Sequence, residues 1–128
     1  TKVFQTTIIP TTTSTDSWAT TTNQSVTAWE NYRTAFNDSL RTSSFGQNAG
    51  EFDIDSALET SIDSGLWNVG GACSPWTPDG VHPLNCSYLQ VQASGVIDTS
   101  RIHYPYLLNR DLDPASNDNG PVGLDEAA

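Results

Sequence analysis

The sequence predicts an α/β fold in which helices cover a mostly parallel β-sheet. Short runs of β-branched and aromatic residues alternate with segments of helical periodicity, in the order strand, helix, strand, loop, helix. The chain has 128 residues, which is enough for one small domain. Hydrophobic residues make up 36% of it, and four Trp, four Tyr and four Phe supply bulky side chains for a core.

The first predicted strand covers residues 3–9, which read VFQTTII and stop at Pro10. The Thr-rich stretch that follows is predicted to be a polar surface loop, with Trp18 as its anchored aromatic residue.

A helix is predicted from residue 25 to about Thr42, with Ser25 or Asn23 as its N-cap. Five residues at helical spacing form its expected buried face: Val26, Trp29, Arg33, Phe36 and Leu40.

Residues 51–58, EFDIDSAL, are predicted to be a second strand, because Phe52 and Ile54 alternate with Asp53 and Asp55. The two aspartates resemble a paired-carboxylate site, but solvation at a strand end or helix capping explains them more simply. The sequence predicts no metal site and no cofactor. Two strands are too few for a stable doubly wound sheet, so further strands are expected from elsewhere.

The segment 59–83 is dense in Gly and Pro and is predicted to be a functional loop. Trp67 and Trp76 are candidate substrate-binding residues, because aromatic faces at a cleft suit sugar rings. The alternative is that both tryptophans only anchor the loop.

A second helix is expected from residue 85 to about 102, with Asn85 as its N-cap and Gly95 in its interior. Its expected apolar face comprises Tyr88, Val91, Gly95, Ile97 and Ile102. The sequence after Tyr104 shows no regular pattern. His103 is interpreted as a packed or surface histidine.

The charge balance excludes two classes of partner. Fifteen acidic against five basic residues give a formal net charge of −10. Phosphate binding needs clustered Lys and Arg, so we expect neither a nucleic-acid partner nor docking on an anionic membrane. No apolar run approaches the ~20 residues of a membrane span.

Cys73 and Cys86 are either a disulfide or free thiols, and we favour the disulfide. Neither they nor the two histidines fit a zinc-finger spacing. The disulfide, the low Lys content and the Thr/Ser/Asn-rich surface predict a secreted or periplasmic protein.

The segment Asp79-Gly80-Val81-His82-Pro83 is the one place where chemistry is concentrated. A turn through Gly80 can fold the Asp79 carboxylate onto His82 Nδ1, which leaves Nε2 free to take a proton from a nucleophile. The alternative is an ordinary tight turn with a packed histidine.

The motif D-G-V-H-P, with the elements around it, resembles the last block of the SGNH (GDSL-type) hydrolases. VFQTTIIP is similar to the fourth strand of that family, EFDID to its short strand ending in Asp, and the helix after the motif to its final helix. The resemblance implies that residues 1–104 are the C-terminal half of a flavodoxin-like three-layer sandwich, and that 105–128 are an irregular extension. It also implies that Asp79 and His82 are catalytic.

The chain departs from the family in lacking a Gly-Asp-Ser block and a Gly-x-Asn-Asp block, and it contains no G-x-S-x-G elbow. It also contains no Met and begins with Thr1. We therefore expect a partner, an N-terminal fragment or chain that carries both blocks and without which the fold is incomplete.

The resemblance implies a serine ester hydrolase, in which the partner supplies the Ser and the oxyanion donors. The expected substrate is an acyl ester, such as an acetyl ester on a carbohydrate. One alternative is a non-catalytic α/β binding or assembly module. Another takes Thr1 as the N-terminal nucleophile of a self-processed amidohydrolase, although the α/β pattern disagrees with the antiparallel layers that this requires.

Overall fold

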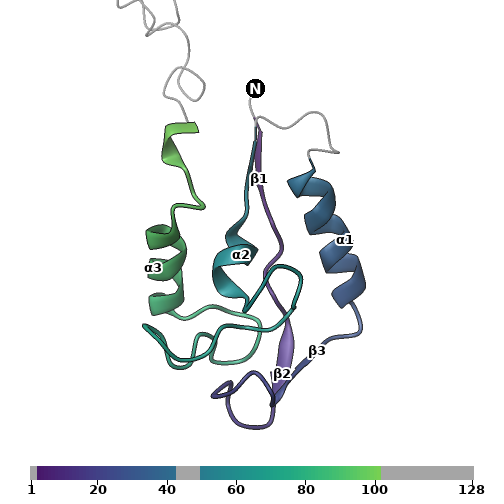
Figure 1. Cartoon of the computed structure of the whole chain (residues 1–128), viewed down its shortest axis with the longest axis vertical. Helices are drawn as coiled ribbons and strands as arrows, with labels where there is room; N and C mark the ends of the chain where they lie inside the picture. The colour runs from purple at the N-terminus through teal and green to yellow at the C-terminus, as the bar shows by residue number, and fades with distance from the viewer. Residues whose placement is uncertain (1–2, 43–49, 102–128) are drawn as a thin grey trace, which may run out of the picture.

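The computed structural model of this chain describes residues 3–42 and 50–101 (Figure 1). The residues predicted to form an irregular extension, 105–128, lie outside this part of the chain, as does His103. In chain order the elements are β1 (Phe4–Thr6), β2 (Thr12–Ser14), β3 (Gln24–Val26), α1 (Glu30–Arg41), β4 (Gly50–Phe52), α2 (Ile54–Leu58), α3 (Asn85–Ser94) and the 3-10 helix η1 (Thr99–Arg101).

Two strand pairs organise the fold, and the mixed α/β class predicted from the sequence is confirmed at this level. β1 pairs with β4 in parallel, and β2 pairs with β3 in an antiparallel arrangement. A parallel pair requires a long crossover connection, and here the crossover contains α1. Phe4 on β1 stacks on Phe52 on β4, with ring centroids 5.5 Å apart.

The helices lie on either side of the parallel pair (Figure 1). α1 lies on one side, and α2 and α3, which pack against each other, lie on the other. The main hydrophobic core belongs to α2, α3 and the long loop between them: Leu58, Trp67, Cys73, Trp76 and Val91. Within residues 3–42 and 50–101, no helix has the length and apolar content needed to cross a membrane.

The first helix begins five residues later than the sequence predicts. Residues 24–26 form β3 instead, because they pair with β2 and because the buried Gln24 side chain binds both backbone groups of Trp67. Trp29 holds the N-cap position and no side chain caps the helix. The predicted end near Thr42 is confirmed.

The predicted strand over 51–58 is wrong in its second half. β4 ends at Phe52, and Ile54–Leu58 form α2. The chain turns here because the Asp53 carboxylate accepts hydrogen bonds from Thr7 Oγ1 at 3.1 Å and Arg41 Nε at 2.9 Å. The backbone N–H of Asp55 donates to Thr7 Oγ1 at 2.9 Å.

The second helix begins at Asn85 as predicted but ends at Ser94. Gly95 is its C-cap, with φ +75°, rather than an interior residue, which fits the preference of glycine for this left-handed position. Leu84, and not Asn85, holds the N-cap position. The predicted apolar face is wrong in part, because Val91 is buried while Tyr88 and Ile97 are exposed.

The predicted disulfide is present between Cys73 and Cys86, whose Cα atoms are 5.7 Å apart. Cys73 is buried in the core and Cys86 lies in the first turn of α3. The bond therefore ties the long loop to the helix that follows the Asp79–His82 segment.

Reduction of this disulfide should lower the free energy of unfolding by about 3 kcal/mol, because it frees a loop of about 14 residues in the unfolded chain. Urea unfolding with and without dithiothreitol measures the change. The Cys73→Ser/Cys86→Ser double variant is the control and should be insensitive to the reductant. Superimposable curves for the wild type would contradict the prediction.

Candidate functional site

Asp79 and His82 face each other across a tight turn at the surface. His82 Nδ1 lies 2.7 Å from Asp79 Oδ2. The other carboxylate oxygen, Oδ1, accepts hydrogen bonds from the backbone N–H groups of Val81 at 2.9 Å and His82 at 2.8 Å. The structure thus brings together the two residues that the sequence predicted to be catalytic.

These hydrogen bonds keep the Asp79 carboxylate ionised. The backbone N–H of His82, followed by its ring and the Val81 N–H, lowers the pKa of the Asp79 carboxyl well below its usual range. An ionised carboxylate can only accept, so Nδ1 of a neutral His82 must carry the proton and Nε2 must carry the lone pair. Nε2 has no hydrogen-bond partner among the described residues, and the His82 side chain is 75% exposed.

Gly80 anchors the turn to the rest of the fold. Its carbonyl oxygen accepts hydrogen bonds from the Thr12 N–H at 3.0 Å and from Trp67 Nε1 at 3.0 Å. Its φ is +79°, a conformation that glycine adopts without steric cost. A Cβ atom here would lie far inside the van der Waals contact distance to the Thr12 carbonyl oxygen and 2.6 Å from the Trp18 ring.

The two candidate substrate-binding tryptophans lie in the core. Trp67 is 0% exposed and donates to the Gly80 carbonyl, and Trp76 is 8% exposed and donates to the Gly70 carbonyl at 2.9 Å. This placement favours the alternative interpretation, in which they anchor the loop. Trp67 supports the Asp79–His82 turn from beneath.

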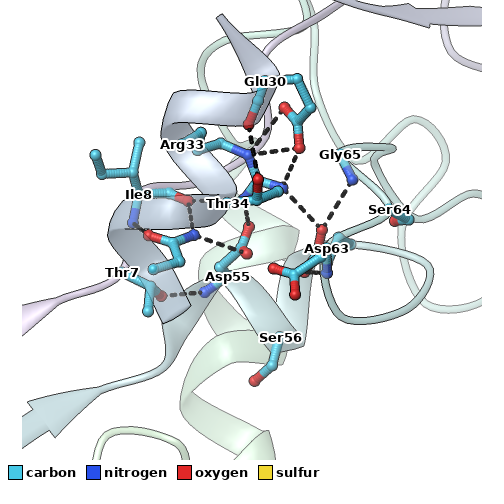
Figure 2. A network of polar contacts seen from close by, with 12 residues as sticks. Thr7, Ile8, Glu30, Arg33, Thr34, Asp55, Ser56, Asp63, Ser64 and Gly65 are labelled. Atoms are coloured by element: carbon cyan, nitrogen blue, oxygen red, sulfur yellow. Dashed lines mark hydrogen bonds and ion pairs between the residues drawn. The ribbon is translucent and has the colours of Figure 1, made fainter. Parts of the chain in front are cut away.

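A second polar cluster lies between α1 and α2 and was missed by sequence reasoning (Figure 2). Arg33 is on the buried face of α1, as the helical spacing predicts, but it is charged and 6% exposed. Its guanidinium contacts Glu30 at 2.5 Å, Asp55 at 2.6 Å and Glu59 at 3.2 Å. Burial lowers the pKa of Arg33, but the Glu30 and Asp55 carboxylates outweigh it and raise that pKa above its ordinary value.

Arg41 adds a second guanidinium to this cluster. It contacts Asp53 at 2.9 Å, Asp55 at 3.1 Å and Asp63 at 2.7 Å. Asp55, Glu59 and Asp63 place carboxylate oxygens within 4.8 Å of one another, which is a spacing suited to a metal ion. Because guanidinium groups already contact all three, the arrangement is that of an ion-pair network.

Glu59 is a carboxyl of this network whose pKa is clearly raised. Burial, followed by the neighbouring Asp55, raises the pKa of Glu59 to about 7. Its oxygens accept hydrogen bonds from the backbone N–H groups of Asp63 at 2.7 Å and Gly65 at 3.0 Å. The side chain therefore keeps its proton only below about pH 7, and it holds the start of the long loop from a buried position.

A groove of about 310 Å³ lies beside the N-terminal end of α1. Trp29 and Tyr32, with ring centroids 5.8 Å apart, are 72% and 65% exposed along it. The groove is separate from the Asp79–His82 pair, neither residue of which lines it. Its lining residues are Ile8, Thr11, Thr27, Trp29, Glu30, Tyr32, Arg33 and Phe36.

The arrangement at Asp79 and His82 can act as an oriented general base, with an ionised carboxylate behind the imidazole and an open Nε2 in front. Comparison with family models, with curated proteins and with solved structures found no match for this chain. The function must therefore be argued from the geometry of the site and the residues of the motif.

Gly80→Ala should destabilise the fold by about 2 kcal/mol or more, since the added methyl group is strained at a positive φ and also clashes with Thr12 and Trp18. Gly71→Ala is the matched control, because Gly71 has φ +68° and open space around its Cβ position. Urea unfolding should show a larger loss of unfolding free energy for Gly80→Ala than for Gly71→Ala. Equal losses would contradict the prediction that the close contacts around Gly80 add to the strain.

The Glu59→Gln substitution should remove a loss of unfolding free energy that the wild type shows as the pH rises. The folded chain keeps the Glu59 proton up to about pH 7, whereas the unfolded chain releases it near 4.5. The wild type should therefore lose roughly 2 kcal/mol of unfolding free energy as the pH rises through that window.

Chemical denaturation between pH 4 and 8 measures this slope. Asp38→Asn removes a 59% exposed carboxylate at the edge of the same network and should keep the slope. The prediction is wrong if Glu59→Gln follows the wild-type slope.

Proposed function

We propose that this chain supplies the Asp–His half of the active site of a serine ester hydrolase of the SGNH type. The observation that carries the proposal is the 2.7 Å contact of Asp79 Oδ2 with His82 Nδ1, which leaves Nε2 exposed. The pair stands in a D-G-V-H-P motif, which is the block in which that family carries the same two roles.

In the proposed mechanism, His82 Nε2 removes the proton from a serine hydroxyl as its Oγ attacks the ester carbonyl carbon. The imidazolium then gives that proton to the departing alcohol, as the bond from the carbonyl carbon to the alcohol oxygen breaks. A water molecule, activated in the same way by Nε2, releases the acyl group and regenerates the serine. Asp79 holds the ring and stabilises the imidazolium charge.

The serine and the oxyanion donors are proposed to come from an N-terminal part that carries the Gly-Asp-Ser and Gly-x-Asn-Asp blocks. The described residues contain a single parallel strand pair, whereas parallel sheets of α/β proteins are larger and covered on both faces. Addition of strands to this pair would give the flavodoxin-like sandwich that the resemblance implies.

The proposed substrate is an acyl ester, with a short acyl group such as acetyl. A preference for carbohydrate esters rested on Trp67 and Trp76, and their burial in this chain gives that preference no support. The Cys73–Cys86 disulfide supports location in an oxidising compartment, as in a secreted or periplasmic protein.

The second candidate function is a non-catalytic assembly module. The observation that favours it is the exposed Trp29–Tyr32 pair beside the groove on α1, because exposed aromatic residues are enriched at protein interfaces. Labelling by a fluorophosphonate probe separates the two functions. The hydrolase proposal expects a labelled serine on a polypeptide that copurifies with this chain, and the module expects none.

His82→Ala should lower kcat/KM of the assembled protein for p-nitrophenyl acetate by about a thousandfold or more, because the general base is lost. The folded state should be little affected, since the His82 side chain is 75% exposed. Val81→Ala, an exposed neighbour, is the control and should retain activity. Unchanged turnover in His82→Ala would rule out the mechanism.

A further inference from the structure

Thr77 lies beneath the Asp79–His82 turn and is 0% exposed. Its Oγ1 accepts a hydrogen bond from the Gly80 N–H at 2.8 Å and donates one to the His82 carbonyl oxygen at 2.8 Å. Asp79 Oδ1 is farther away, at 3.5 Å. Because a hydroxyl has one proton to donate, the closer His82 carbonyl is its acceptor.

This hydroxyl therefore joins the middle and the end of the turn. The Gly80 N–H is bound by Thr77, and the Gly80 carbonyl is bound by Thr12 and Trp67, so the residue in the middle of the turn is held through its N–H and its carbonyl. The His82 backbone is held through its carbonyl by Thr77 and through its N–H by Asp79.

The two catalytic side chains themselves have little packing to hold them. The side chain of His82 is 75% exposed and that of Asp79 is 49% exposed, and a hydrogen bond between exposed side chains adds little net stability. The backbone of the turn must therefore determine whether Nδ1 faces the carboxylate.

We infer that Thr77 is a positioning residue, whose buried hydroxyl fixes the turn so that Asp79 selects the Nδ1-protonated form of His82. The inference deepens the proposed hydrolase function and rests on it for the statement that the pair is catalytic. The tautomer of His82 is a property of this chain alone, because the hydrogen bond at one ring nitrogen decides which nitrogen carries the proton.

The test measures the tautomer of His82 by ¹⁵N NMR of histidine-labelled chain at pH 8, without substrate. His82→Ala identifies the signals of the other histidine. The wild type should show a protonated Nδ1 and a bare Nε2. Thr77→Val, which keeps the shape and removes the hydroxyl, should shift the ratio of tautomers toward protonated Nε2 by about fivefold or more. Thr77→Ser should retain the wild-type ratio.

Ser87→Ala is the matched control. Ser87 is also 0% exposed, and its hydroxyl donates to the Trp76 carbonyl oxygen, next to Thr77, without touching the turn. It should lower the unfolding temperature and leave the tautomer ratio unchanged. The inference is overturned if Thr77→Val keeps the wild-type ratio, or if Ser87→Ala shifts it equally.

Hydrogen exchange in the wild type keeps the inference testable if Thr77→Val does not fold. The Gly80 N–H should exchange at least about tenfold more slowly than an unprotected amide, and exchange at the unprotected rate would overturn the inference. In the assembled protein, Thr77→Val should lower kcat with KM unchanged. A tautomer shift in a chain for which no labelled serine is found would support the role of Thr77 in positioning while refuting the hydrolase.

Discussion

The fold depends on the buried guanidinium of Arg33. It donates to the Ile8 carbonyl beyond β1 at 3.0 Å and contacts Glu30 on α1, Asp55 on α2 and Glu59 at the start of the long loop. A buried charge is costly to desolvate, and removal of one partner leaves the others uncompensated. The network therefore penalises any arrangement that separates these four segments. It acts as a geometric constraint on the fold more than as a source of net stability.

A continuous chain of contacts leads from Arg33 to the Asp79–His82 turn. Glu59 accepts hydrogen bonds from the following loop and forms a β-bridge with Trp67. Gln24 on β3 fixes both backbone groups of Trp67 at 2.9 Å. The indole of Trp67 then donates to the carbonyl of Gly80. Buried polar contacts thus place an exposed turn, although neither side chain of the Asp79–His82 pair packs in the core.

The features that sequence reasoning predicted depend on local contacts. The Asp79–His82 pair is three residues apart, and a turn through glycine is enough to form it. Residues 24–26 and 54–58 were assigned to the wrong type of element, because their partners are distant in sequence. Gln24 binds Trp67, 43 residues away, and the Asp55 N–H binds Thr7, 48 residues away. Arg33 was predicted to lie on the buried face, but no periodicity could reveal that acidic residues from α2 and the long loop would meet it there.

Two carboxyls of this chain have pKa values shifted in opposite directions, and the contrast fits the role proposed for Asp79 and the structural position of Glu59. Asp79 lies at the surface, where backbone N–H groups and the His82 ring lower its pKa, so it stays ionised and keeps the proton on Nδ1. Glu59 lies beside Asp55 in the interior, where burial raises its pKa to about 7. A carboxylate that must orient a base has to remain charged at the working pH. A carboxyl that only joins structural segments can keep its proton without loss of function, since it accepts the same backbone hydrogen bonds in either state.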